Sequence, residues 1–115
     1  MQDISRLARA ARIRALNDAF RAPALTLRGW LLTAGVEAKG PEFIHAAIAA
    51  VQAYDRFDED SDPNGEHDFG SLELEGETIF WKIDYYDLEL RLGSPDPADP
   101  EKTRRLLTLM LASDY

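Results

Sequence analysis

The sequence predicts an α+β fold: a single domain over residues 1–115 in which about three helices pack on a small, mostly antiparallel sheet, made of a central strand and a hairpin. Three observations predict it. Apolar residues recur with helical spacing in the first half of the chain, and apolar and polar residues alternate in the second half. A length of 115 residues with 45% hydrophobic content is sufficient for one core.

The first expected helix ends before Pro23. Its packing face follows i, i+3, i+4 and i+7 spacing and consists of Ile13, Leu16, Asn17 and Phe20. Ile4 lies about 180° away from Ile13 on such a helix, so one core cannot bury both residues. We therefore expect residues 1–12 to fray; the alternative is that their apolar face meets another subunit.

A strand and a second helix are expected next. Residues 25–34 are apolar on both faces around Trp30, which is typical of a central strand. Gly40-Pro41-Glu42 then opens a helix, because proline suits the first helical position and an acidic residue suits the first turn. Its apolar stripe consists of Phe43, Ile44, Ala47, Ile48, Val51 and Tyr54.

The alternation in residues 72–85 predicts a β-hairpin with its turn at Gly76. Ile79, Trp81, Ile83 and Tyr85 form the apolar face of its second strand. The alternation then slips by one residue at Asp87, and Leu88, Leu90 and Leu92 predict a bulge or turn that leads into a further strand.

A last helix is expected to start at Asp99-Pro100-Glu101, where a cap, a proline and an acid stand in the preferred order. The residues that follow are apolar almost all round, so we expect this helix to be largely buried. They include Leu106, Leu107, Leu109, Met110 and Leu111.

The formal net charge of −8 argues against nucleic-acid binding, because an acidic surface repels phosphates. The chain has no cysteine, which excludes disulfides and thiolate metal sites and favours a reducing compartment, the cytoplasm. No apolar run is long enough to span a membrane. Residues 1–39 are net basic and residues 40–115 are strongly acidic, so either the basic helix folds back on the acidic part or an acidic face stays exposed for a partner.

The acids are densest in residues 55–68, which hold seven carboxylates and one histidine. Asp60-x-Asp62-x-Asn64-Gly65 matches the opening of a calcium loop, but Ser71 stands where the closing carboxylate belongs. A solvated loop with turns closed by aspartate side chains is the favoured interpretation. If this segment does bind a divalent cation, the ligands are expected to be Asp60, Asp62, His67 and Asp68.

No catalytic residue is predicted, since the sequence has no nucleophile elbow, phosphate loop or dinucleotide motif. An aromatic and acidic strip at residues 80–87 is the other candidate for binding, because its alternate rings project away from the apolar face. The residues expected to contact a partner are Asp58, Glu59, Asp60, Asp62, Glu66, Phe80 and Tyr86.

Six strings in the chain resemble a family of small bacterial proteins catalogued as domain of unknown function 3768. They are IRALNDAFR at 13–21, LTAGV at 32–36, FDEDSDPNGEHDFG at 57–70, FWKIDYYD at 80–87, GSPDPADP at 93–100 and LTLMLASDY at 107–115. The resemblance implies a stand-alone bacterial protein, associated with alphaproteobacterial chromosomes and plasmids. It implies no activity and no site residues.

These observations lead to a leading hypothesis and an alternative. The first is a non-enzymatic cytoplasmic protein that presents its acidic surface to a basic protein partner, such as an anti-defence protein of mobile elements that mimics DNA. The alternative is a metal-dependent hydrolase or metal-binding regulator that uses the loop from Asp60 to Asp68. No cofactor is expected apart from that divalent cation.

Overall fold

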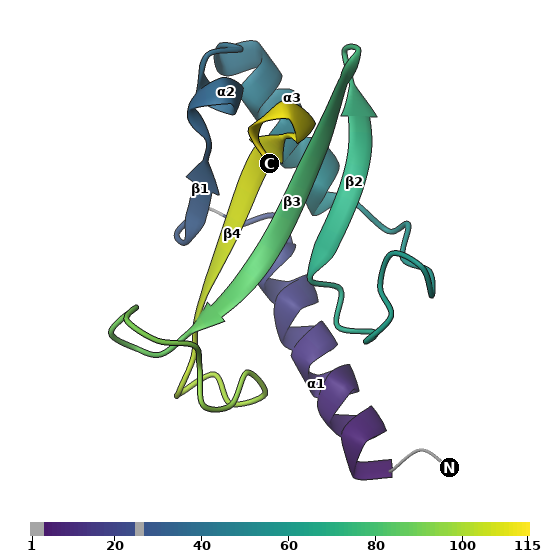
Figure 1. Cartoon of the computed structure of the whole chain (residues 1–115), viewed down its shortest axis with the longest axis vertical. Helices are drawn as coiled ribbons and strands as arrows, with labels where there is room; N and C mark the ends of the chain where they lie inside the picture. The colour runs from purple at the N-terminus through teal and green to yellow at the C-terminus, as the bar shows by residue number, and fades with distance from the viewer. Residues whose placement is uncertain (1–3, 25–26) are drawn as a thin grey trace.

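The computed structural model describes residues 4–24 and 27–115 and contains a four-stranded sheet with helices packed against it (Figure 1). Its strands lie in the order β1-β4-β3-β2, with β1 parallel to β4 and the other pairs antiparallel. The α+β prediction is thereby confirmed. In chain order the elements are α1 (Ile4–Arg21), β1 (Trp30–Leu32), α2 (Ala34–Glu37), α3 (Pro41–Gln52), β2 (Phe69–Leu74), β3 (Glu77–Tyr86), β4 (Arg104–Leu111) and a short 3-10 turn, η1 (Ala112–Asp114).

The two long helices, α1 and α3, cover the same face of the sheet (Figure 1). The α3 side chains Ala47 and Val51 share one core with Trp81 of β3, and all three are fully buried. From α1, Asn17 reaches Tyr85, which lies on the same face of β3 as Trp81. Among the described residues, no helix is long and apolar enough to cross a membrane.

The hairpin and the helix at Pro41 form as predicted. Leu74 pairs with Glu77, which leaves a two-residue turn at Glu75 and Gly76, both with positive φ. This is the backbone geometry that suits the right-handed twist of the strands. Helix α3 begins with Pro41 in its first turn, after Gly40 with φ 93°.

The predicted last helix is wrong, because residues 104–111 form the strand β4. This strand lies between β1 and β3, so it is covered on both edges, and both of its faces carry apolar side chains. A short run such as residues 106–111, apolar except for Thr108, fits a buried strand as well as a buried helix. Asp99 and Pro100 belong to the turn before the strand.

Two strand predictions also need correction. In the segment 25–34 only Trp30–Leu32 is a strand, and it lies at the edge of the sheet where a central strand was expected; residues 25 and 26 lie outside the described part. The further strand expected at Leu88, Leu90 and Leu92 is a loop, and all three side chains are exposed. Leu90 has φ 59°, which is incompatible with extended backbone.

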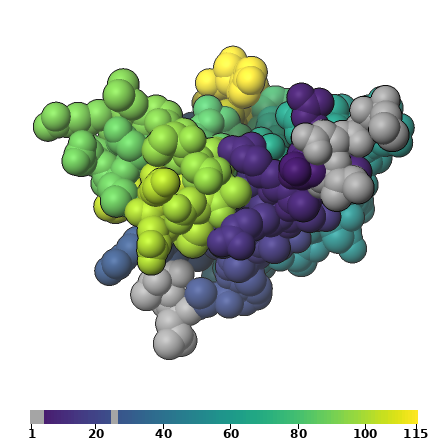
Figure 2. Space-filling view, turned by 90° about the horizontal axis from the view of Figure 1, so that it is seen from below, coloured from purple at the N-terminus to yellow at the C-terminus, as the bar shows by residue number. Residues whose placement is uncertain are grey.

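Of residues 1–12, for which we expected fraying, residues 1–3 lie outside the described part and residues 4–12 are helical as the first half of α1. Polar contacts attach this half to the turn at residues 96–98. Arg9 forms an ion pair with Asp96 at 3.2 Å, and Arg12 Nε donates to the carbonyl of Ala98 at 2.7 Å. In Figure 2 the yellow-green segment that contains this turn packs directly against the purple helix.

Candidate functional site

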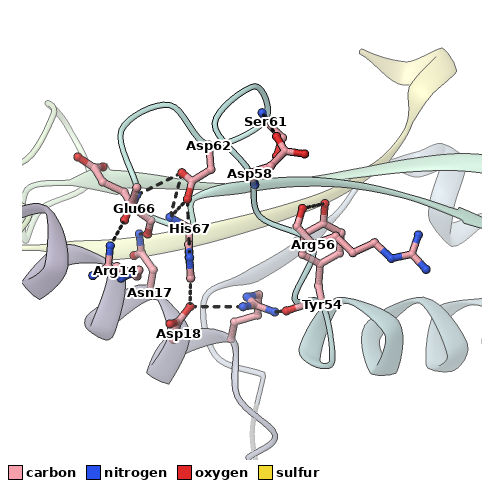
Figure 3. A network of polar contacts seen from close by, with 12 residues as sticks. Arg14, Asn17, Asp18, Tyr54, Arg56, Asp58, Ser61, Asp62, Glu66 and His67 are labelled. Atoms are coloured by element: carbon pink, nitrogen blue, oxygen red, sulfur yellow. Dashed lines mark hydrogen bonds and ion pairs between the residues drawn. The ribbon is translucent and has the colours of Figure 1, made fainter.

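The acidic loop, defined as residues 55–68, connects α3 to β2 and packs against α1 (Figure 3). Arg14 of α1 donates to the carbonyl of Gly65 at 2.9 Å, and Asn17 donates to the carbonyl of Glu66 at 3.0 Å. The basic helix therefore does fold back on the acidic part of the chain. Arg14 and Asn17 hold the loop through its backbone carbonyls, and no ion pair among the described residues joins an arginine of α1 to a carboxylate of the loop.

Asp62 shapes the second half of the loop. Its side chain is only 4% exposed, and its carboxylate accepts the backbone N–H groups of Glu66 and His67 at 3.2 Å. Both Gly65 and His67 have positive φ, so the chain turns sharply around this carboxylate. The calcium-like pattern at Asp60 to Gly65 is therefore closed by an aspartate side chain, as in the favoured interpretation.

The Asp58 carboxylate closes the turn in the first half of the acidic loop in the same way. Its Oδ1 accepts the backbone N–H groups of Asp60 and Ser61 at 2.9 and 2.8 Å. Because these bonds stabilise the carboxylate, chiefly those from Ser61, the pKa of Asp58 lies below its usual range. The loop thus has a defined conformation at both of its turns.

His67 points from the loop toward α1 (Figure 3). Its Nδ1 lies 2.9 Å from Asp18 Oδ1, and its Nε2 lies 3.7 Å from Asp62 Oδ2. Its ring stacks on Phe57 with 3.7 Å between centroids. Both ring nitrogens therefore face carboxylates of this chain, which ties the loop to the helix.

The four expected metal ligands are only partly brought together. Asp62 and His67 are neighbours, and Asp68 lies close enough for the charge of Asp62 to raise its pKa, although burial and the charge of Glu66 contribute more. Asp60 is exposed on the turn. Over residues 4–24 and 27–115, no group of three or more His, Asp or Glu side chains is placed to hold a metal ion.

A buried polar cluster next to the loop was missed by the sequence reasoning. Asn17 is fully buried, donates to the Tyr85 hydroxyl at 2.7 Å, and accepts from Arg105 Nε at 2.6 Å. Tyr85 in turn donates to the Glu66 carboxylate at 2.9 Å, and burial raises the pKa of Tyr85. The available signal was Asn17 itself, a polar residue on the packing face of a helix.

Arg21 is a second buried anchor. Its Nη1 donates to the carbonyls of Val51, in the last turn of α3, and Tyr54, just after that helix, at 2.7 and 2.8 Å, where a cation interacts favourably with the helix dipole. Its guanidinium lies 4.9 Å from the ring centroid of Trp81 and 5.3 Å from that of Phe57 in the acidic loop. Arg21 therefore joins α1, α3, the sheet and the loop.

The expected partner residues fall into three groups. Asp58, Glu59 and Asp60 are exposed, and none of them has an ion pair with a described residue. Asp62 and Glu66 are engaged in the internal contacts given above. Phe80 and Tyr86 lie on β3, on the face of the sheet away from α1, where the Phe80 ring contacts Phe69 and Tyr115.

In a comparison with protein families, the model described as "Protein of unknown function (DUF3768)" matches residues 32–114, most of the chain. The matched range includes the acidic loop, β2, β3 and β4, while α1 and most of β1 precede it. Comparisons with curated proteins and with solved structures found no match. The chain thus belongs to the DUF3768 family, as its sequence strings predicted.

Proposed function

We propose that this protein is a non-enzymatic binding protein and that the acidic loop is its contact surface for a basic protein partner. The observation that carries the proposal is the contrast within the loop. Asp62 and His67 fix its conformation from inside, and Asp58, Glu59 and Asp60 remain exposed without an ion pair to any described residue.

A loop that is already fixed loses little conformational entropy when it binds. The backbone that carries its carboxylates is therefore ordered before the partner arrives, which favours selective recognition of a matching set of Lys or Arg side chains. The net charge of −8 adds a long-range attraction that speeds the encounter with a basic surface.

The finer form of the proposal is a cytoplasmic DNA mimic of a mobile element, in which the carboxylates take the place of backbone phosphates on a DNA-binding nuclease. It rests on the acidic surface and on the lack of cysteine. It predicts that duplex DNA competes with the protein for its partner.

The test compares two variants that remove the same charge. One variant, called the loop variant, combines Asp58→Asn, Glu59→Gln and Asp60→Asn. The matched control combines three substitutions at exposed residues away from the loop, Glu75→Gln, Glu89→Gln and Glu101→Gln. Both are used to recover partners from a lysate of a bacterium that carries the gene. Recovery is measured at about 0.1 M and about 1 M salt, where the screening length falls from about 10 Å to about 3 Å.

We expect the wild type and the control to retain the same basic protein at low salt and to release it at high salt, while the loop variant fails to retain it. Release by added duplex DNA would support the DNA-mimic form. A partner that the loop variant retains as well as the control does, or no salt-sensitive partner at all, would refute the proposal.

The alternative, a metal-dependent function, is supported by the closeness of Asp62 and His67. Elemental analysis after dialysis tests it: a stoichiometric ion in the wild type that is lost from a folded His67→Ala variant would favour the alternative. Without such an ion the acidic loop acts through its charge alone.

A further inference from the structure

A groove of about 600 Å³ lies between α1 and the start of β4, away from the acidic loop. It exists because β1 pairs only with residues 107–109 of β4, so no strand lies beside Arg104–Leu106 on that side. Apolar side chains from three separate segments line it, namely Leu16, Ala19 and Phe20 from α1, Leu31 from β1, and Pro100 and Leu106 from the end of the chain.

The size and lining of the groove are typical of sites for small molecules, which bind in concave, largely apolar pockets of about 300–1,000 Å³. Leu31, one of the apolar residues that line the groove, is 48% exposed. A ligand that covers it would remove this apolar area from water.

The charge of the groove is opposite to that of the whole protein. Three arginines line it and no carboxylate does, although the chain has 21 acidic and 13 basic residues. Arg105 is already engaged, since it donates to Asn17 and to the carbonyl of Pro97. Arg28 and Arg104 are exposed, and their side chains make no hydrogen bond or ion pair with residues 4–24 and 27–115.

We propose that this groove binds a small molecule that joins an apolar chain or ring to a single carboxylate. The apolar part would lie along Leu16, Phe20 and Leu106, and the carboxylate would meet the free guanidinium groups of Arg28 and Arg104. A guanidinium presents two parallel N–H groups that match the two oxygens of a carboxylate. The site shares no residue with the acidic loop, so it is independent of the function proposed above.

The experiment uses octanoate as the probe, with octanol and octylamine as neutral and cationic molecules of the same chain length. Each is titrated into the ¹⁵N-labelled full-length protein, and the amide shifts are followed by NMR. We expect octanoate to shift the amides of Ala19, Phe20, Leu31 and Leu106. We expect octanol to bind about tenfold more weakly, the ratio that corresponds to about 1.4 kcal/mol, and octylamine to bind more weakly still.

Two variants and one control separate the contribution of the arginine charges to binding from that of the groove's shape. Arg28→Gln with Arg104→Gln should lower the affinity for octanoate to that for octanol and leave the affinity for octanol unchanged. Arg56→Gln with Arg91→Gln removes the same charge from exposed residues outside the groove and should change neither affinity. Ala19→Trp, at an exposed position on the wall, fills the groove and should abolish binding of both molecules.

Equal binding of octanoate and octanol would overturn the proposal, because the arginines would then play no part. It would also be overturned if the Arg28 and Arg104 variant kept the wild-type affinity, or if the shifts were scattered over the surface. The amide spectrum of each variant reports its folding in the same measurement, so a loss of binding through unfolding is recognised directly.

Discussion

The acidic loop and the loop at residues 87–93, here called the leucine loop, are fixed in different ways. The acidic loop is closed by its own Asp58 and Asp62 and is held in addition by residues 14–18 of α1, which are about fifty residues away in the sequence. The leucine loop is held by its own first residue: Asp87 Oδ1 accepts from the N–H of Arg91 at 2.9 Å, and Asp87 N–H donates to the carbonyl of Leu92 at 2.9 Å.

This difference indicates which loop opens only when the whole fold unfolds. Opening the acidic loop breaks contacts with α1 and uncovers the buried carboxylate of Asp62, so it is coupled to global unfolding. Opening the leucine loop breaks local hydrogen bonds and exposes little new apolar surface, because Leu88, Leu90 and Leu92 are already 52%, 43% and 71% exposed. We expect it to open independently of the core.

The largest effect is expected for Asp62→Ala. The substitution leaves the N–H groups of Glu66 and His67 without their charged acceptor, so we expect it to lower the free energy of unfolding by about 2–3 kcal/mol. Urea unfolding followed by tryptophan fluorescence measures this. Asp60→Ala, in the same turn but exposed, is the control and should cost no more than about 0.5 kcal/mol. Equal losses for the two variants would show that the loop is not anchored through Asp62.

A smaller effect of opposite sign is expected for Asp68→Asn. Burial, and then the charge of Glu66, raise the pKa of Asp68, so its ionised form is less favourable in the folded than in the unfolded protein. The penalty is absent below the unfolded pKa of about 3.9, grows as the pH rises toward the folded pKa, and is complete above it.

The Asp68→Asn variant should therefore be more stable than the wild type at pH 7, by no more than about 1 kcal/mol because solvent reaches the half-buried side chain. Urea midpoints measured at pH 7 and near pH 4 check this, and the gain should shrink at the lower pH. A gain that is independent of pH would instead point to better packing of the amide. The acidic loop would then contain no electrostatic strain at this position.

The smallest effect on global stability is expected for Asp87→Ala. Since the carboxylate holds only its own loop, we expect the free energy of unfolding to change by less than about 0.5 kcal/mol. Hydrogen exchange should nevertheless become faster at the amides of Leu90 and Arg91, which lose the constraint of the closed loop. A global loss comparable to that of Asp62→Ala would remove the distinction between the two loops.

Local signals in the sequence were sufficient to predict the hairpin and α3. Glu75 and Gly76 supply a two-residue turn between alternating strands, and Pro41 starts a helix with a one-sided apolar stripe. In both cases the pattern and the turn chemistry lie within a dozen residues of each other, so no distant contact was needed to interpret them.

The places of β1 and β4 could not be predicted in this way. Leu106–Leu111 is apolar without a period, and only the neighbours on both sides decide that it is a strand. The same holds for Trp30–Leu32, which lies at the edge because β4, more than seventy residues later, occupies the centre. At Leu88, Leu90 and Leu92 the alternation was present, but no strand pairs with them.

In the candidate site, too, local features could be predicted from the sequence and features that depend on distant contacts could not. The turns closed by aspartate side chains were expected from Asp60 to Gly65, because such turns are local. The contact of His67 with Asp18, and the cluster of Asn17, Tyr85 and Arg105, join residues that are 49 to 88 positions apart in the sequence. No spacing rule connects them.

The central position of β4 has a consequence for synthesis on the ribosome. Until Arg104–Leu111 has emerged, only the β2–β3 hairpin and the helices are available, and an isolated two-stranded hairpin is marginally stable in water. A nascent chain that stops before residue 104 therefore has no partner for β1 and leaves the apolar faces of Trp81 and Val51 only partly covered. The sheet is completed only when β4, the last of its four strands in chain order, has been translated, which makes β3 and α3 the parts that a chaperone would need to shield until then.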